Sequence, residues 1–306
     1  MRLAVAATPE VAIPTLEFLL SGTNPLVRVF TTEDKAVGRG RNLTPSDVAI
    51  WADDHGVECI KVGKAVEMAA HLGDIDCVVT VAFGILLPPE ILSIPTHGFI
   101  NLHFSLLPAW RGAAPVQRAI ENGDHELGIS VFALDQGMDT GPIYRQTSFP
   151  RATDMRSKEA LEFLGEQGVA LIAETLEDIS KGVTPTQQIT DGISLARKLS
   201  KAEALIDWQL PSAVIDRKVA AFYPNPIAFS HFRGEIVKIT RSRMSHDLLN
   251  DLSLKAGEWM IEKDRVLIGT GDKPLEIVQL IPQGKSEMSA SEWARGARIN
   301  PGELCG

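Results

Sequence analysis

Two polar side chains alternate with apolar ones in residues 97–112, which read HGFINLHFSLLPAWRG. Asn101 and His103 stand two positions apart, and side chains of a strand alternate between its faces with a period of two. We therefore expect both side chains on one face of a strand. Pro108 cannot continue a sheet ladder, so the pair should lie at the carboxyl end of that strand, where open α/β sheets bind their ligands.

An amide and an imidazole in this arrangement suit acyl transfer. The amide can donate hydrogen bonds to a carbonyl oxygen, and the imidazole can donate or carry a proton near neutral pH. Ser105 is a poor candidate for a nucleophile because no G-x-S-x-G turn surrounds it. The alternative is structural: Asn101 and His103 would satisfy buried backbone groups at the strand end, and the pair alone leaves that alternative open.

The run N-x-H-x-S-L-L-P followed by x-x-R-G resembles the signature of the folate-dependent formyltransferases. In that family an Asn, a His and a later Asp surround the formyl group that is transferred. The resemblance implies that Asn101, His103 and Asp139 are the catalytic residues, with Asp139 in the turn LDQGMDTGP, and that no metal is needed. An aspartate in a turn is more often a local cap, so the role of Asp139 depends on its proximity to His103.

The composition is that of an ordinary globular protein. The 306 residues are 44% hydrophobic and 23% charged, and this length suits two domains. The three cysteines form no C-x-x-C pair, so they predict neither a disulfide framework nor a zinc site. The amino terminus does not read as a signal peptide, and no apolar run approaches the ~20 residues of a membrane span. We expect a cytoplasmic protein that does not enter the membrane.

The first half of the chain alternates strand-like and helix-like segments, which predicts an α/β fold with a Rossmann-like, mostly parallel sheet. The strand-like runs are 2–7, 26–31, 57–61, 76–83 and 98–103, and the helix-like ones 9–21, 45–55, 64–72 and 113–122. Thr8 and Thr44 each precede a proline and are expected to cap helices. The first strand is not followed by a G-x-G-x-x-G motif, so a dinucleotide is not expected.

The second half predicts one long helix at 155–181, a helix at 211–222, and then short strands separated by turns. Those strands, at 227–232, 235–241, 256–261, 265–269 and 274–281, suggest a small OB-like β-barrel, followed by a last helix near 290–296. The expected organisation is a catalytic domain over 1–189, a linker over 190–207 and a barrel domain over 208–306. The run RKLSKAEALIDW at 197–208 resembles the segment that joins the two domains of family members acting on tRNA.

The resemblance extends to ligand-binding segments. It implies a folate site built from two runs, with residues Phe83, Gly84, Leu86, Ser105, Leu106, Leu107 and Pro108. It also implies tRNA contacts by Arg39, Arg41, Lys198 and Lys201. Without the family, the first run would read as a strand entering a helix, and the GRGR loop at 38–41 as a solvent loop.

The charge distribution bears on nucleic acid binding. A net charge of −9 argues against it, since phosphate binders usually present a basic surface. The acidic excess lies in the first 189 residues, however, whereas residues 197–243 hold nine Lys and Arg against four Asp and Glu. This span could supply a phosphate-facing strip, and a solvated mixed-charge face is the alternative.

The resemblance implies that the chain transfers the formyl group of 10-formyltetrahydrofolate to the methionyl group of initiator tRNA. We expect a monomer whose partners are that tRNA and the folate. Two alternatives are a formyltransferase of the same fold acting on an amino sugar nucleotide, and a 10-formyltetrahydrofolate hydrolase. A noncatalytic RNA-binding protein would leave the Asn101, His103 and Asp139 set unexplained.

Overall fold

The computed structural model describes residues 1–37, 42–244 and 254–306. Its contacts divide the chain into two compact units, of which the first comprises Met1–Pro115, Glu126–Pro150 and Leu161–Ala196. The second comprises Val116–His125, Arg151–Ala160 and Arg197–Gly306. Most of helix α4 (Pro115–Asn122) and the first turn of helix α5 (Ser157–Ser180) therefore belong to the second unit.

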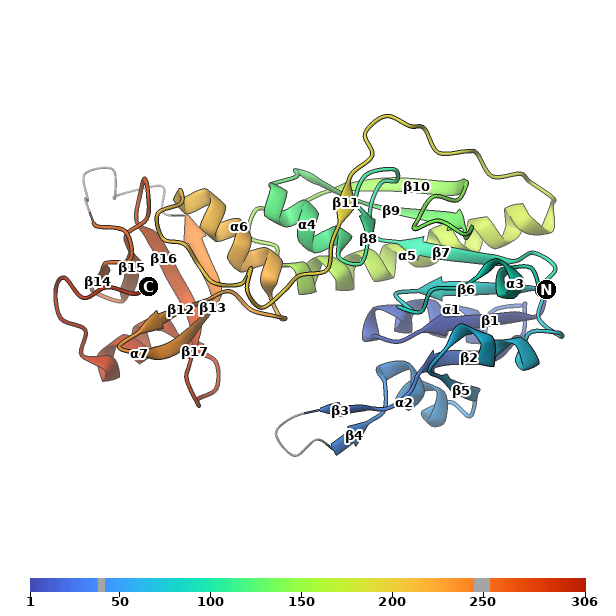
Figure 1. Ribbon diagram of the computed structural model, residues 1–306, viewed down its shortest axis with the longest axis horizontal. Helices are drawn as coiled ribbons and strands as arrows, with labels where there is room; N and C mark the ends of the chain where they lie inside the picture. The colour runs from blue at the N-terminus through green and yellow to red at the C-terminus, as the bar shows by residue number, and fades with distance from the viewer. Residues whose placement is uncertain (38–41, 245–253) are drawn as a thin grey trace. The chain divides into compact units, whose positions relative to one another are not determined.

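A seven-stranded sheet in the order β10-β9-β7-β6-β1-β2-β5 forms the centre of the first unit (Figure 1). The strands are β1 (Leu3–Ala7), β2 (Leu26–Thr32), β5 (Glu58–Val62), β6 (Cys77–Val81), β7 (Phe99–His103), β9 (Glu126–Ala133) and β10 (Ile143–Pro150). The five from β7 to β5 pair in parallel, and β9 runs antiparallel to both of its neighbours, β7 and β10. Every residue of β1 and β6 is buried, as expected for parallel strands covered on both faces. The Rossmann-like sheet predicted from the sequence is confirmed.

Helices flank this sheet, and some of them begin later than predicted. The elements are η1 (Glu10–Ala12), α1 (Ile13–Ser21), α2 (Asp47–Asp54), η2 (Ala65–His71) and α3 (Pro89–Leu92), of which η1 and η2 are 3-10 helices. Ser46 caps α2, since its hydroxyl accepts the Ala49 N–H, so the cap predicted at Thr44 is wrong. Thr8 caps no helix either, because its hydroxyl donates to the Phe83 carbonyl.

Two short ladders lie outside the main sheet. Strands β3 (Lys35–Val37) and β4 (Asn42–Thr44) pair antiparallel. Strand β8 (Arg111–Gly112) pairs in parallel with β11 (Leu195–Ala196), which brings the chain after α5 back to the loop after β7. Helix α5 packs on β7 closely enough that a Cβ at Gly168 would collide with the Leu102 side chain.

The second unit contains an antiparallel sheet in the order β12-β13-β16-β15-β14, with β17 paired to β16. Its strands are β12 (Phe229–Phe232), β13 (Glu235–Met244), β14 (Trp259–Glu262), β15 (Arg265–Ile268), β16 (Leu275–Pro282) and β17 (Met288–Ser289). Helices α6 (Ser212–Phe222) and α7 (Ala290–Ala297) accompany it, and Phe232, Trp259 and Trp293 form an aromatic cluster. The separate carboxyl-terminal β domain predicted from the sequence is confirmed as an antiparallel sheet. Within the described part of the chain, no helix is both long and apolar enough to cross a membrane.

Candidate active site

The strand β7 carries both polar side chains that the sequence singled out. His103 is its last residue and is 5% exposed, and Asn101 is half-buried two positions earlier on the same face. On one side β7 pairs with β6, where Thr80 stands opposite Asn101; on the other it pairs with β9, where Ser130 stands opposite His103. The two side chains therefore sit in the middle of the sheet, at the carboxyl end of a central strand.

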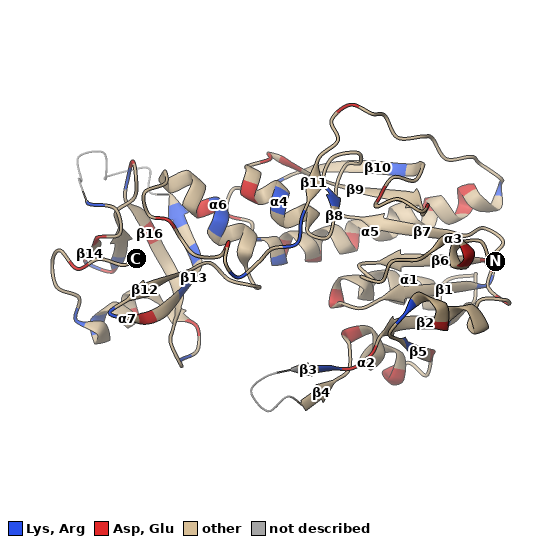
Figure 2. Cartoon of the chain, viewed as in Figure 1, with Lys and Arg blue, Asp and Glu red and all other residues tan. Residues whose placement is uncertain are grey.

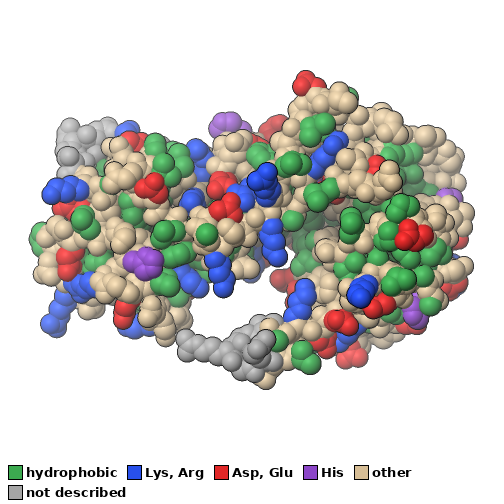
Figure 3. All heavy atoms as spheres, in the orientation of Figure 1, with side chains coloured by type: hydrophobic (Ala, Val, Ile, Leu, Met, Phe, Trp, Pro, Cys, Tyr) green, Lys and Arg blue, Asp and Glu red, His purple; other side chains and the backbone are tan. Residues whose placement is uncertain are grey.

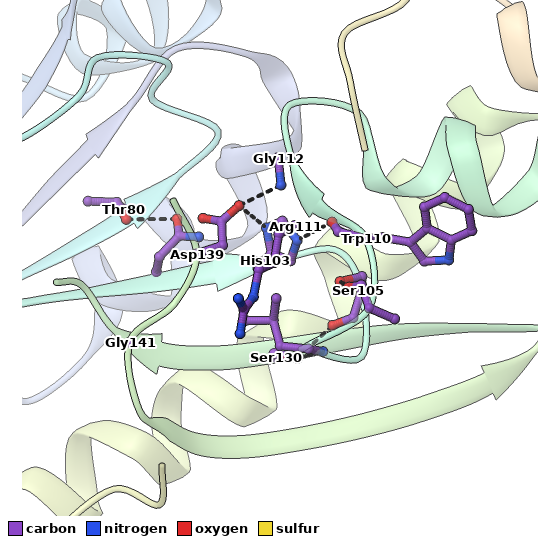
Figure 4. Close-up of polar contacts among 12 residues, drawn as sticks. Thr80, His103, Ser105, Trp110, Arg111, Gly112, Ser130, Asp139 and Gly141 are labelled. Carbon is purple, nitrogen blue, oxygen red and sulfur yellow. Dashed lines mark hydrogen bonds and ion pairs between the residues drawn. The ribbon is translucent and has the colours of Figure 1, made fainter. Parts of the chain in front are cut away.

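The His103 ring is held by the loop that follows β7. Its Nε2 lies 3.0 Å from the carbonyl oxygen of Trp110, and a carbonyl can only accept a hydrogen bond. Nε2 therefore carries the proton, and Nδ1 of the neutral ring has a free lone pair. Trp110 adopts a left-handed φ of 59°, and its N–H donates to the Ser194 hydroxyl. Figure 4 shows the ring between this carbonyl and Asp139.

Burial lowers the pKa of the His103 imidazole below its ordinary value near 6.5, although the Asp139 carboxylate and the bond to Trp110 act in the opposite direction. Burial therefore favours the neutral form of the ring. Its unprotonated Nδ1 lies 3.8 Å from Oδ2 of Asp139, which is outside hydrogen-bond distance and within reach of an ion pair. A proton accepted at Nδ1 would produce an imidazolium facing a carboxylate.

Asp139 lies in the loop between β9 and β10, and its carboxylate is turned toward the end of β7. Its Oδ2 accepts the Gly112 N–H at 2.7 Å, and its backbone has a left-handed φ of 54°. The local capping role belongs instead to Asp135, which accepts the Gly137 N–H and the Thr140 hydroxyl. The proximity of Asp139 to His103, on which the sequence-based assignment depended, is present.

The Asn101 side chain is oriented by Thr80. The Thr80 hydroxyl lies 2.8 Å from Oδ1 of Asn101 and 3.0 Å from the Ile100 carbonyl. Because Thr80 donates to the carbonyl end of the amide, the NH₂ end is the one that can donate to a ligand. An amide donor, a neutral imidazole with an open Nδ1 and a carboxylate thus come from β7 and one neighbouring loop, which is a suitable set for transfer of an acyl group to an amine.

Comparison with known proteins decides the family. The family model described as formyl transferase matches residues 1–174, and the one described as formyl transferase, C-terminal domain, matches residues 198–298. The chain belongs to the formyl transferase family.

Full-length relatives of this formyl transferase carry a more specific name. The methionyl-tRNA formyltransferase of Salinispora tropica is 42% identical over 309 residues, which cover 99% of each chain. That of Thermobifida fusca is 40% identical over 311 residues, covering 100% of this chain and 99% of the relative.

Solved structures share the fold. HypX from Aquifex aeolicus in complex with tetrahydrofolic acid has a TM-score of 0.68 at 19% identity and covers 96% of this chain and 47% of that one. The methionyl-tRNA formyltransferase from Clostridium thermocellum has a TM-score of 0.58 at 16% identity, covering 80% of this chain and 94% of that one. At such identities the likeness shows the fold alone.

The residues expected to bind folate divide into a buried and an exposed group. Phe83, Ser105, Leu107 and Pro108 are buried, whereas Gly84, Leu86 and Leu106 are exposed. Leu86 is 77% exposed, which leaves its apolar surface open to a ligand. Figure 3 shows hydrophobic side chains, in green, at the surface of the first unit. The exposed group can contact a flat ligand directly, and the buried group supports the turns that present it. The folate assignment itself stays a prediction.

Ser105 does not act as a free hydroxyl. It is 3% exposed, and its Oγ donates to the Ala109 carbonyl at 2.6 Å. The Ser130 hydroxyl, on β9, donates to the Ser105 carbonyl in turn. Ser105 therefore shapes the turn after β7, in keeping with the prediction that it is not a nucleophile.

The basic residues expected to contact tRNA are only partly described. Arg39 and Arg41 lie outside the described residues. Lys198 and Lys201 are exposed members of the second unit, in the segment before α6, and Figure 2 marks the positions of Lys and Arg along the ribbon of that unit in blue. Their contact with tRNA stays a prediction.

Three groups at the site were not found from the sequence. Thr80 could have been found from the sequence, because it carries the one hydroxyl group in the buried strand CVVTV. The Trp110 carbonyl gave no signal, since a backbone group has no sequence pattern of its own. Gln188, which bonds to the carbonyls of Asp139 and Gly141, lies outside every regular element that the sequence predicts. In the described ranges no group of three or more His, Cys, Asp or Glu is placed to hold a metal ion.

Proposed function

We propose that this chain transfers the formyl group of 10-formyltetrahydrofolate to the α-amino group of methionine esterified to initiator tRNA. The observation that carries the proposal is the identity of 40–42% over essentially the whole chain to proteins named methionyl-tRNA formyltransferase. The site supports it, because formyl transfer to an amine requires a proton acceptor for the amine and a donor for the formyl oxygen.

His103 accepts the proton in this proposal. The neutral amine attacks the formyl carbon, a new bond forms between them, and the bond from that carbon to N10 of the folate breaks. The proton that the amine loses passes to Nδ1 of His103, and from there to N10. The Asp139 carboxylate, 3.8 Å from Nδ1, stabilises the imidazolium that exists between the two transfers.

Asn101 stabilises the formyl oxygen. As the amine adds, that oxygen gains negative charge, and the NH₂ end of the Asn101 side chain is turned to donate to it. Loss of one such donor typically lowers the rate about 100- to 1,000-fold. The sequence suggested His103 as a second donor to this oxygen; the neutral tautomer makes Nδ1 an acceptor, so His103 donates only after it has taken the proton.

The folate and the tRNA use different surfaces in this proposal. The pterin lies against the exposed apolar residues Leu86 and Leu106 beside Gly84, whose φ is 77°. Lys198 and Lys201 contact phosphates of the tRNA. The protein acts as a monomer in the cytoplasm, which is the expectation from its sequence.

Product analysis tests the proposal. The purified chain is incubated with 10-formyltetrahydrofolate and with either methionyl initiator tRNA or an amino sugar nucleotide, and the acceptors are analysed by mass spectrometry. We expect one formyl group on the methionyl amine and none on the sugar. Formylation of the sugar alone would favour the first alternative, and release of formate at the full rate without any acceptor would favour the hydrolase.

A further inference from the structure

The segment between α5 and the second unit is bonded to both loops of the candidate site. In this segment, Thr186 exchanges two backbone hydrogen bonds with Ile143 at the start of β10. Further on, the Ser194 carbonyl accepts the Arg111 N–H and the Ser194 hydroxyl accepts the Trp110 N–H. The segment thus runs from the Asp139 loop to the loop after β7, where β11 lies beside β8 (Figure 1).

Gln188 is the side chain of this segment that joins the two loops. Its Oε1 accepts from Nε and Nη2 of Arg111 at 3.2 and 2.6 Å. Its Nε2 donates to the carbonyls of Asp139 and Gly141 at 2.9 and 2.8 Å. A guanidinium can only donate and a carbonyl can only accept, so the orientation of the amide is fixed by its partners.

These bonds close a ring of interactions around Asp139. Arg111 holds Gln188, Gln188 holds the Asp139 backbone, and the N–H of Gly112, next to Arg111, holds the Asp139 carboxylate at 2.7 Å. Asp139 needs such support, because a left-handed φ of 54° is strained for a residue with a Cβ. A Cβ at Gly112 would lie 2.7 Å from the Ala196 carbonyl, so this ring also depends on close approach of the segment to β8.

We propose that Gln188 is a positioning residue, which holds the Asp139 loop so that the carboxylate faces Nδ1 of His103. Gln188 acts through Asp139 and does not touch the substrate. The expected effect of Gln188 on kcat rests on the proposed formyl transfer. Its structural consequence, the electrostatic contact between Asp139 and His103, is independent of the reaction.

The test compares Gln188→Met with Gln188→Asn and with a matched control. Met has the length of Gln and makes neither set of bonds, and Asn is one methylene too short to reach both partners. Gln187→Met alters the neighbouring residue and should behave as wild type. In both Gln188 variants we expect kcat to fall about 10- to 100-fold with KM within about threefold, since small misplacements of a catalytic group reduce the rate and not the affinity.

The pKa of His103 is the second readout, measured by NMR titration without substrates. The Asp139 carboxylate raises this pKa against the effect of burial. If Gln188 holds the carboxylate in place, its substitution lowers the His103 pKa, in the same direction as Asp139→Asn. A role in stability alone would lower the melting temperature and leave the His103 pKa unchanged.

The outcomes are distinct. Variants with a wild-type kcat and an unchanged His103 pKa would overturn the inference. If the wild-type chain itself transferred no formyl group, the proposed function would fail, and the His103 titration would still decide the role of Gln188. If Gln188→Met does not fold, the shorter Gln188→Asn gives both readouts.

Discussion

The candidate site and the charged surface of the second unit are built in opposite ways. At the site, His103 is buried, and the His103 and Asn101 side chains are each oriented by a hydrogen bond with another part of the chain, to the Trp110 carbonyl and from the Thr80 hydroxyl. In the second unit, the basic side chains lie at the surface, where some pair with carboxylates and others, such as Lys198, are exposed. Buried, fixed groups suit chemistry, and exposed cations suit electrostatic attraction of a phosphate chain.

The comparison also shows why a charge count over part of a sequence overstates a basic surface. Residues 197–243 have an excess of Lys and Arg, yet three of those arginines are in ion pairs with carboxylates outside that span. The pairs are Arg233–Glu303 at 2.7 Å, Arg241–Glu159 at 2.7 Å and Arg243–Glu276 at 2.8 Å. The partners come from sequence positions far away, so only the fold reveals them. Of the other six cations of that span, Arg197, Lys198, Lys201 and Lys238 are exposed and remain candidates for phosphate contact.

The difference between the buried site and the exposed surface of the second unit predicts that substitutions at the site lower kcat and that substitutions of the surface lysines raise KM.

The largest effect is expected for His103→Ala, which removes the proton acceptor. We expect kcat to fall about 100- to 1,000-fold, with the melting temperature showing that the fold is retained. A kcat within threefold of wild type would assign His103 a structural role.

Asp139→Asn is expected to lower kcat about 100-fold and to shift the pH profile. The rate should rise with pH as His103 loses its proton, with a midpoint below the ordinary value of 6.5, because burial lowers this pKa. Asp139 opposes that effect, so its neutralisation should move the midpoint to still lower pH. The measurement is kcat/KM as a function of pH, and a midpoint that moves upward would contradict the electrostatic role of Asp139.

Thr80→Val is expected to have a smaller effect, about tenfold in kcat. The valine keeps the size of the buried side chain and removes the hydroxyl that orients Asn101, so the amide can turn away from the formyl oxygen. Thr80→Ser keeps the hydroxyl and is the matched control. An equal fall in kcat in both variants would indicate that Thr80 acts through the packing of β6 and does not orient the Asn101 amide.

The double variant Lys198→Ala, Lys201→Ala is expected to have the smallest effect, about a three- to tenfold rise in KM for tRNA with kcat unchanged. A lysine that binds a phosphate displaces condensed counterions, so without these two lysines the plot of log KM against log salt should flatten by roughly one to two units. The control is the double variant Lys273→Ala, Lys285→Ala, which removes two other exposed lysines of the same unit. A salt slope equal to that of wild type would show that Lys198 and Lys201 do not contact tRNA phosphates.

Much of the fold could be predicted from local patterns. The strand-like runs predicted at 2–7 and 76–83 contain β1 and β6, and they are rich in apolar residues because parallel strands are buried on both faces. The period-two alternation around Asn101 and His103 placed both on one face of β7. The starts of the helices were less predictable, since Ser46 competes with Thr44 for the cap and only the backbone geometry selects one.

The site could be predicted as far as its residues have characteristic types. Asn101, His103 and Asp139 were recognised from their motif, and the structure brings Asp139 to His103. The bonds that orient them could not be predicted, because they involve the Trp110 backbone and Gln188, a residue 49 positions from the carbonyl of Asp139 that it holds. Such partners are chosen by the tertiary fold and leave no local pattern.

The central claim is that Asn101, His103 and Asp139 act as one unit in formyl transfer. Single-turnover rates of methionyl-tRNA formylation, measured for the three single variants and for the triple variant, test it most directly. Groups that act together are not additive, so the triple variant should be within about tenfold of the slowest single variant, far below wild type. Single variants with near wild-type rates, or losses that multiply fully in the triple variant, would contradict the claim.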